Sequence, residues 1–322
     1  KKKFFNKRVR FIGPKGYFFA NKSRILKNIV CMIYLFFNLL KNNKNTLVFS
    51  FQANVIAVII SKLTFTKVIT RANSSPSGWK GNAFKKLIYR LLLNLSDKII
   101  VNSEEFKKEF FKDFKIKANC IYNPFNKFQI LNKIRKRNKK NFKNKRLLKI
   151  LTVGRLTDQK DQITLLRAVK LLNPNTLIEV IIIGKGKNQI FLKNFITANN
   201  LNHIVRLVGY QSNPYTFINK SNIVVLTSKY EGLPNVLLEA QFLKKYIIST
   251  NCPTGPKEIL LNGKAGDLIK IGDFYKLAKL INNFYKNKNK NKKKILFGKK
   301  NFQRFDFNTN CEKYYKLINF LI

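Results

Sequence analysis

Beyond residue 146, short runs rich in Ile, Val and Leu alternate with longer segments in which apolar residues recur at helical spacing. The pattern predicts strands at Leu147–Val153, Leu177–Ile183, Ile204–Val208, Asn222–Ser228 and Tyr246–Thr250, and helices at Gln162–Leu172, Gln189–Ala198, Val236–Lys244 and Phe274–Tyr285. Because the strands are near-continuous apolar runs, helices should cover both faces of a parallel sheet. This half of the chain is therefore predicted to be a doubly wound α/β domain.

The first half of the chain shows a weaker pattern of the same kind. It predicts strands at Leu47–Phe51, Lys67–Thr70 and Lys98–Asn102, and helices at Ile25–Leu40, Asn54–Lys62 and Phe84–Leu95. Between the halves lies Asn132–Arg146, a run of cations and Asn typical of a solvated linker, and Lys286–Lys294 is a second such run. We expect an N-terminal domain at 1–131, a basic linker at 132–146 and a second domain at 147–300.

The composition is strongly basic. Among 322 residues there are 64 Lys and Arg but only 15 Asp and Glu, a formal net charge of +49. Such an excess favours anionic partners: nucleic acid, phospholipid headgroups or phosphorylated substrates. A coding bias toward Lys, Asn, Ile and Phe explains the charge equally well. Acids are so scarce, however, that those in patterned places are informative.

Other classes of protein receive little support. The four cysteines are far apart, which argues against a zinc site or a disulfide framework and favours a reducing cytosol. The apolar stretch Ile29–Leu40 is too short to span a bilayer, and Leu47–Phe65 is interrupted by polar residues. The sole histidine, His203, is expected in a surface loop, so no mechanism with a histidine base is predicted.

Two carboxylates flank a turn that opens an apolar helix, in the segment Glu231-Gly-Leu-Pro-Asn-Val-Leu-Leu-Glu239. The backbone N–H groups at such a helix start form an anion site through unpaired donors and the helix dipole. Glu231 should lie ahead of the helix facing a cleft. Glu239 should lie one turn in, where a carboxylate can accept hydrogen bonds from a ribose diol. Each carboxylate alone could equally be a partner for the helix dipole.

Cations and glycines follow other predicted strands, at the sheet edge where ligands of α/β proteins bind. Gly154 and Arg155 follow the first strand of the second domain, with Lys160 five residues after the Arg. Two cations within reach of a diphosphate would offset its charge, although both could simply be solvated.

Two further strand ends carry glycine. Gly184 opens Gly184-Lys185-Gly186, which resembles part of a phosphate loop but is also compatible with a tight turn. Gly209 and Tyr210 follow another strand, where the backbone could meet a nucleobase edge.

Five segments in order, VGRLTDQKD, IIGKGKN, LVGYQSNP, VVLTSKYEGLPNVLLEAQ and NCPTGPKEIL, resemble the C-terminal half of glycosyltransferase family 4. The resemblance runs from Ile150 to about Leu268, and the spacing Glu-x7-Glu is its most specific motif. The last segment resembles members that act on bacterial surface polysaccharides. The implied fold is GT-B: two doubly wound Rossmann-like α/β domains with the active site in the cleft between them.

The resemblance also implies roles for single residues. Arg155 and Lys160 would bind the donor diphosphate and stabilise the leaving UDP, Glu231 would contact the transferred sugar and Glu239 the ribose. The backbone would meet phosphate or sugar hydroxyls at Gly232, Leu233, Pro234 and Asn235. Catalysis would need no metal and no cofactor, and the configuration of the transferred sugar would be retained. Glu231, Arg155 and Lys160 are thus the candidate catalytic residues.

The N-terminal domain resembles the acceptor side of the family more loosely. Arg71 and Asn73 fit a loop that faces the cleft. The usual Gly-Gly loop after the first strand is missing, so we expect a chain that is truncated at its start. Val48–Gln52 stands where many members carry an active-site histidine. Residues 301–322 are expected to form a helix that returns to the first domain.

These features favour a retaining glycosyltransferase that moves a hexose or N-acetylhexosamine from a UDP-sugar to a lipid-linked or surface-polysaccharide glycan. The basic runs would sit on the anionic inner leaflet of the cytoplasmic membrane, giving a cytoplasmic, peripheral location. Two alternatives stay open: a truncated, inactive remnant that binds UDP, and a basic nucleic-acid-binding protein. The second would leave Glu231 and Glu239 unexplained beside a polyanion, so nucleic acid is not an expected partner.

Overall fold

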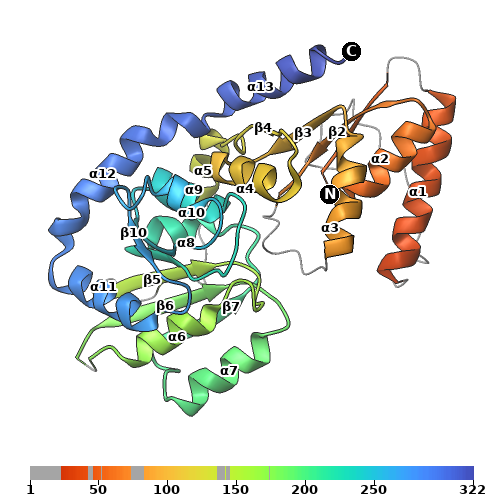
Figure 1. The fold of residues 1–322 in the computed structure, drawn as a ribbon. Helices are drawn as coiled ribbons and strands as arrows, with labels where there is room; N and C mark the ends of the chain where they lie inside the picture. The colour runs from red at the N-terminus through yellow and green to blue at the C-terminus, as the bar shows by residue number, and fades with distance from the viewer. Residues whose placement is uncertain are drawn as a thin grey trace.

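Two parallel sheets, each flanked by helices, lie side by side in the computed structural model of the chain (Figure 1). The structure describes residues 23–42, 46–51, 53–73, 83–135, 142, 146–173 and 175–322. Every strand pairing among these residues is parallel. The expected α/β class and the two-sheet architecture are therefore confirmed.

The first sheet has the strand order β1-β2-β3-β4. Its strands are β1 (Leu47–Ser50), β2 (Lys67–Arg71), β3 (Lys98–Val101) and β4 (Asn119–Cys120), and its helices are α1 (Arg24–Lys41), α2 (Asn54–Leu63), α3 (Ala83–Asn94), α4 (Glu104–Phe114) and α5 (Lys127–Ile134). Phe106, Phe110 and Phe114 form one buried stripe of α4 that packs with Val101 of β3. The apolar face of α4 thus holds this charged helix against the sheet.

The second sheet has the order β10-β9-β8-β5-β6-β7. Its strands are β5 (Leu148–Val153), β6 (Ile178–Ile183), β7 (Val205–Gly209), β8 (Ile223–Leu226), β9 (Tyr246–Thr250) and β10 (Asp267–Ile269). Its helices are α6 (Gln162–Lys170), α7 (Gln189–Ala198), α8 (Tyr215–Lys220), α9 (Asn235–Phe242), α10 (Pro256–Ile259) and α11 (Phe274–Lys286). Two buried clusters of Ile, Val and Leu cover the two faces, as near-continuous apolar strands require.

The chain crosses from one side of this sheet to the other at its centre. After β5 it adds β6 and β7 on one side, and then it returns to add β8 on the other side of β5. The direction of strand order therefore reverses between β5 and β8. In open parallel sheets such a reversal leaves a crevice at the carboxyl ends of the strands, where ligands bind.

The predicted elements of both halves are present within a few residues of the expected ends, whereas α4, α5, α8, α10, β4 and β10 were not predicted. The basic run Lys286–Lys294 was interpreted as a solvated linker, and this is wrong. It holds the end of α11, the 3-10 helix η4 (Lys288–Asn291) and the start of α12 (Lys292–Lys300). Gly298 of α12 lies against the side chain of Gln241, and Ile295 packs against the core of the second sheet, so both contacts hold the helix on the domain.

The predicted linker 132–146 also begins inside a helix, because α5 continues to Ile134. Within the rest of that range the structure describes Arg135, Phe142 and Arg146, and the other residues lie outside the described part. Phe142 is buried in the core of the second sheet. Part of this segment therefore packs on the second domain rather than standing in solvent.

The two halves interlock through charged and backbone groups. The Glu258 carboxylate of α10 accepts the backbone N–H of Glu104 and of Glu105, at 3.1 and 2.9 Å, and the Tyr122 hydroxyl at 2.6 Å. In return, the Glu105 carboxylate accepts the N–H of Gly255 at 3.1 Å. Each domain thus provides an acceptor for backbone donors of the other.

The end of the chain returns to the first sheet (Figure 1). The 3-10 helix η5 (Asn301–Phe305) leads into α13 (Phe307–Asn319), whose Tyr314 and Ile318 pack with Ile69 and Ile100. The helix expected over residues 301–322 begins at Phe307, after η5, and ends at Asn319. Among the described helices, none combines the length and the hydropathy needed to cross a membrane.

Phe305 joins the two halves at this crossing. It is fully buried, its ring centroid lies 5.0 Å from that of Tyr122, and its backbone oxygen accepts the N–H of Phe125 at 3.1 Å.

We predict that Phe305→Ala lowers the free energy of unfolding by about 3–5 kcal/mol, because it leaves a cavity between the halves. Urea denaturation measures this change. Tyr315→Ala, at a side chain that is 65% exposed on α13, is the control and should change stability by less than about 0.5 kcal/mol. Equal effects of the two substitutions would contradict the prediction.

Candidate functional site

The loops that follow β5 and β8 meet at the central crevice of the second sheet. Lys160, from the first loop, and Glu231, from the second, form an ion pair with 2.5 Å between Nζ and Oε1. Their side chains are only 16% and 8% exposed. The sequence placed these residues 71 positions apart, and the strand order brings them into contact.

Several further hydrogen bonds fix the two loops to each other. The backbone N–H of Lys229 donates to the backbone oxygen of Gln159 at 2.8 Å. The side-chain amide of Gln159 donates to the backbone oxygen of Tyr230 at 2.9 Å. The Thr227 hydroxyl donates to the Lys160 oxygen at 3.0 Å. Gln159 and Thr227 were not among the predicted site residues, although both lie within the quoted motifs. The ion pair therefore sits in a preorganised frame rather than on mobile loops.

Arg155 lies at the mouth of the crevice. Its guanidinium is exposed and donates to the Gln159 side chain at 3.2 Å, and its backbone oxygen accepts from Gln162 at 2.9 Å. Gly154, just before it, lies against the aliphatic part of Lys160, about 3.5 Å from where a Cβ would be. The two predicted cations thus occupy one loop, with Lys160 half-buried and Arg155 exposed.

The glycines after β6 and β7 have a steric explanation. A Cβ on Gly184 would lie 1.8 Å from the backbone oxygen of Gly154, and one on Gly186 would lie 2.2 Å from that of Leu156. These positions require glycine because two strand–helix loops touch there. Gly209 has a positive φ of 70°, and the Tyr210 side chain beside it is 68% exposed. The proximity of Gly184 to Gly154 shapes the crevice, whereas Tyr210 lies outside the packed frame.

The segment between Glu231 and α9 touches the first domain. A Cβ on Gly232 would lie 2.4 Å from the backbone oxygen of Asn73, so the two backbones meet across the domain boundary. Leu233 is buried in the core, and Pro234 caps α9 without a side-chain hydrogen bond. The Asn235 side chain accepts from Asn123 of the first domain at 2.6 Å.

Glu239 lies one turn into α9, as predicted, and is partly exposed. Burial away from water raises the pKa of its carboxyl to about 7, and Lys133 of α5 acts in the opposite direction. Lys133 also lies over the ring of Tyr215, 5.4 Å from its centroid. Lys133 was not among the predicted site residues, because it lies within the range predicted as a linker. The two carboxylates of the motif thus have different surroundings: Glu231 is paired with a cation and Glu239 is mainly desolvated.

The predicted acceptor-side residues lie at the carboxyl end of β2. Arg71 donates to the side chain of Asn123, and its guanidinium lies over the rings of Phe51 and Tyr314, 5.7 and 5.8 Å from their centroids. The side chain of Asn73 donates to the Phe51 oxygen at 3.1 Å. Both residues therefore face the same boundary as Gly232.

Unsatisfied polar atoms occur at three strand ends, two in the first domain and one in the second. Within the described part of the chain, Arg71 Nε, Asn102 Oδ1 and Ser228 Oγ are buried without a hydrogen-bond partner. Buried polar atoms without partners are rare in folded proteins, and they are expected where a ligand completes the site. The described residues contain no group of three or more His, Cys, Asp and Glu side chains able to hold a metal ion.

Comparison with known families decides the family of the chain. The family described as "Glycosyl transferases group 1" matches residues 133–301, just over half of the chain. The chain belongs to this family. The match covers Arg155, Lys160, Glu231 and Glu239 together.

Curated relatives agree with the family. An uncharacterized glycosyltransferase of Methanocaldococcus jannaschii is 34% identical over 65% of this chain and 55% of its own length. A Campylobacter jejuni protein is 27% identical over 64% and 57%; its name is N-acetylgalactosamine-N,N'-diacetylbacillosaminyl-diphospho-undecaprenol 4-alpha-N-acetylgalactosaminyltransferase. The chain therefore spans a little over half the length of these two relatives.

Solved structures establish the fold as GT-B. Anabaena HepE in complex with UDP-glucose superimposes with a TM-score of 0.74 at 18% identity, covering 93% of this chain and 84% of that one. Staphylococcus aureus TarM superimposes with a TM-score of 0.72 at 19% identity, covering 91% and 58%. The expected two Rossmann-like domains are thus confirmed.

The pKa of Glu239 gives a pH prediction. Its folded pKa, about 7, is above the ordinary value of 4.5, so the unfolded chain loses the proton first as the pH rises. We predict that the stability of the wild type falls relative to Glu239→Gln between about pH 4.5 and 7, by at most about 3 kcal/mol. Urea denaturation at several pH values measures this difference. Glu312→Gln, which removes an exposed carboxylate, is the control, and a constant difference between wild type and Glu239→Gln would contradict the prediction.

Proposed function

We propose that this glycosyltransferase moves a hexose or N-acetylhexosamine from a UDP-sugar to a lipid-linked or surface-polysaccharide glycan. The observation that carries the proposal is the Lys160–Glu231 ion pair at the point where the strand order reverses, with Arg155 at its mouth. Such a crevice is where α/β sheets bind nucleotides. The complexes of HepE with UDP and UDP-glucose and the name of the C. jejuni relative support the substrate classes.

The donor diphosphate would lie between the two cations and the start of α9. Arg155 and Lys160 offset its charge, and the N-terminus of α9 carries backbone N–H groups and a positive dipole end. As the bond to the sugar breaks, negative charge builds up on the leaving UDP. Preorganised cations stabilise that charge without reorganisation, so no metal ion is needed in this proposal.

Glu231 and Glu239 would bind the two ends of the donor. Lys160 holds the Glu231 carboxylate beside the diphosphate position, where it can accept hydrogen bonds from hydroxyls of the transferred sugar. The partly exposed carboxylate of Glu239 would accept hydrogen bonds from the ribose diol. These bonds would replace the hydrogen bonds to water that the carboxylate lost on burial. An acceptor that attacks from the side on which UDP leaves would give retention of configuration.

The first test is thermal unfolding of the purified chain with and without excess UDP. Ligand at about a hundred times its dissociation constant should stabilise the folded state by about 2.7 kcal/mol. We predict a shift that is specific to UDP over GDP and ADP and is lost in Glu239→Ala. Glu312→Ala, at an exposed carboxylate of α13, is the matched control and should keep the shift.

The outcomes separate the candidate functions. A UDP shift followed by transfer from a UDP-sugar supports the enzyme. A UDP shift without transfer from any UDP-sugar supports the inactive remnant. No shift with any of the three nucleotides would sink the proposed donor site.

We further propose that the protein binds the anionic inner leaflet of the cytoplasmic membrane through the basic run Lys286–Lys294. Lys288, Lys290, Lys292 and Lys293 are exposed, whereas Lys294 pairs with Asp267 at 2.7 Å. Each basic residue near an anionic surface contributes about 1 kcal/mol. We predict that changing these four exposed lysines to Gln strongly lowers the fraction of the protein that sediments with phosphatidylserine vesicles.

A matched variant controls for net charge alone. Changing Lys108, Lys112, Lys117 and Lys193 to Gln removes four exposed cations from other elements. This variant should retain most of the vesicle binding. Equal binding by the two variants would show that the basic run is not the membrane surface.

A further inference from the structure

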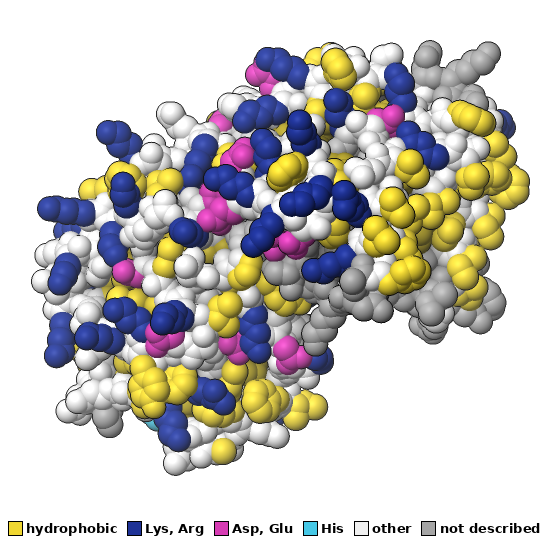
Figure 2. Space-filling view, viewed as in Figure 1, with side chains coloured by type: hydrophobic (Ala, Val, Ile, Leu, Met, Phe, Trp, Pro, Cys, Tyr) yellow, Lys and Arg dark blue, Asp and Glu magenta, His cyan; other side chains and the backbone are white. Residues whose placement is uncertain are grey.

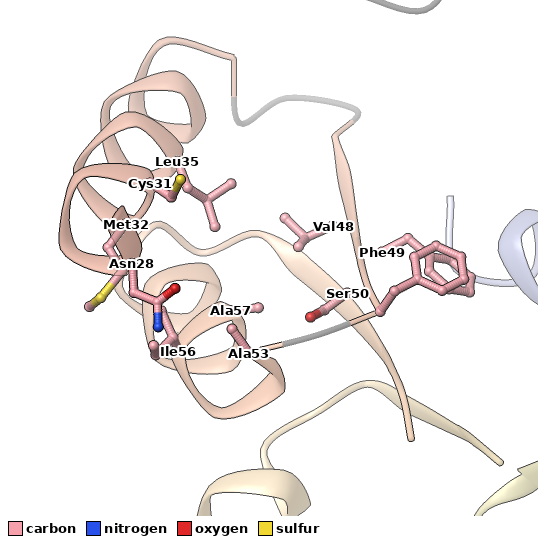
Figure 3. A pocket seen from close by; sticks show the side chains of 11 residues that line it. Asn28, Cys31, Met32, Leu35, Val48, Phe49, Ser50, Ala53, Ile56 and Ala57 are labelled. Carbon is pink, nitrogen blue, oxygen red and sulfur yellow. The ribbon is translucent and has the colours of Figure 1, made fainter. Parts of the chain in front are cut away.

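An apolar cavity of about 290 Å³ lies in the first domain, between α1, β1 and α2 (Figure 3). Leu35 of α1 and Val48 of β1 face each other across it, and Ala53 and Ala57 border it at α2. Its volume is about twice that of the roughly 150 Å³ apolar cavity that binds benzene in an engineered protein. The cavity is open to the surface at Cys31, whose side chain is exposed. It can therefore admit a flexible apolar group from outside.

The cavity lies at the carboxyl end of β1, on the edge of the first sheet that faces the donor site. Ser50, at its rim, donates to Asn54 Oδ1 at 2.9 Å, and Asn54 Nδ2 donates to the Arg71 oxygen at 3.0 Å. Phe51, also at the rim, accepts from Asn73, whose backbone meets Gly232. A short hydrogen-bonded layer thus separates the cavity from the loop that carries Glu231.

The surface around the cavity is apolar and basic. Several large apolar side chains of α1, α2 and α3 are exposed: Ile33, Phe37, Leu40, Leu63, Phe84 and Leu91. Figure 2 shows hydrophobic side chains gathered over this end of the molecule. The three helices carry Lys and Arg but no Asp or Glu. This combination is typical of helices that contact the interface of an anionic bilayer, so the cavity opens within a lipid-compatible surface.

We propose that this cavity holds a stretch of the hydrocarbon chain of the lipid-linked acceptor, while the sugar end of that acceptor reaches Arg71 and Asn73. The inference rests on the proposed function and names the part of the acceptor that the first domain would recognise. The hydrocarbon chain and the sugar of the acceptor would then be held on opposite sides of the layer formed by Ser50, Asn54 and Arg71. The apolar part would supply affinity that does not depend on the identity of the sugar.

Hydrocarbon length should control binding in a way that a charged surface does not. Burial of each methylene raises affinity by roughly three- to four-fold. A neutral alcohol is a suitable probe, because it carries a chain and no anionic group that the basic surface would attract. The free thiol of Cys31 reports on occupancy, since a chain in the cavity covers a residue that lines it.

The experiment measures the alkylation rate of Cys31 by N-ethylmaleimide in the full chain, with 1-octanol or 1-decanol present. We predict that both alcohols slow alkylation and that 1-decanol reaches half protection at a concentration roughly tenfold lower than 1-octanol. Cys311, on α13 and outside the cavity lining, is followed in the same digests and should keep its rate. Slowing of both thiols alike, or no dependence on chain length, would overturn the proposal.

A filled cavity provides the matched variant. Ala57→Phe places a ring in the cavity and should abolish protection of Cys31, whereas Ala57→Ser at the same position should retain it. Ala57 does not belong to the donor site, so both variants should keep the thermal shift with UDP. If Ala57→Phe fails to fold, the chain-length series on the wild type decides by itself.

The two proposals fail in different ways. A UDP shift without protection of Cys31 overturns the cavity proposal alone. Protection of Cys31 without any UDP shift overturns the proposed donor site. The hydrocarbon bound in the cavity could then no longer be assigned to a glycan acceptor.

Discussion

The candidate site depends on one constraint, the adjacency of β5 and β8 at the centre of the second sheet. The strands pair in parallel, so the loops that follow them emerge at the same edge. Lys160 and Glu231 meet there as a nearly buried ion pair, and a buried pair is tolerable only when its geometry is good and its neighbours are fixed. The hydrogen bonds of Gln159 and Thr227 supply that fixation, and so the same frame that stabilises the pair also holds it ready for an anionic ligand.

The boundary between the domains is formed by backbone as much as by side chains. Gly232 meets Asn73, and Gly255 meets Gly232, at distances that leave no room for a Cβ. Glu258 and Glu105 accept backbone N–H groups across the same boundary. The pKa of the Glu105 carboxyl is raised mainly because it is buried, and also because the charge of Glu258 is nearby. The loop with Glu231 is therefore held from both sides, which explains why the proposed donor and acceptor groups can converge on it.

The two motif carboxylates illustrate how one helix start can serve two purposes. Glu231 precedes α9 and has its cation in the structure, whereas Glu239 is inside the helix and is mainly desolvated. A carboxylate paired with a cation is held in a fixed position, and a desolvated one gains most from a ligand that donates hydrogen bonds. In the first domain, the cavity beside β1 adds an apolar counterpart to this polar edge. Apolar recognition would thus lie in the first domain, beside the polar groups that both domains contribute at their boundary.

The sequence by itself determined the class of fold and the motif residues. Long apolar strands alternating with amphipathic helices have a local period that can be read without any tertiary contact, and the Glu231–Glu239 spacing is a local pattern of the same kind. It could not determine the contacts of these residues, because Lys160 and Glu231 meet only through the strand order, and Gly184 is required only by the backbone of Gly154. The helix α12 was missed for the same reason, since its Ile295 and Gly298 contact core residues that are distant in the sequence. Lys133 beside Glu239 and the cavity between α1 and α2 were likewise decided by packing between distant segments, which leaves no signal in the local sequence.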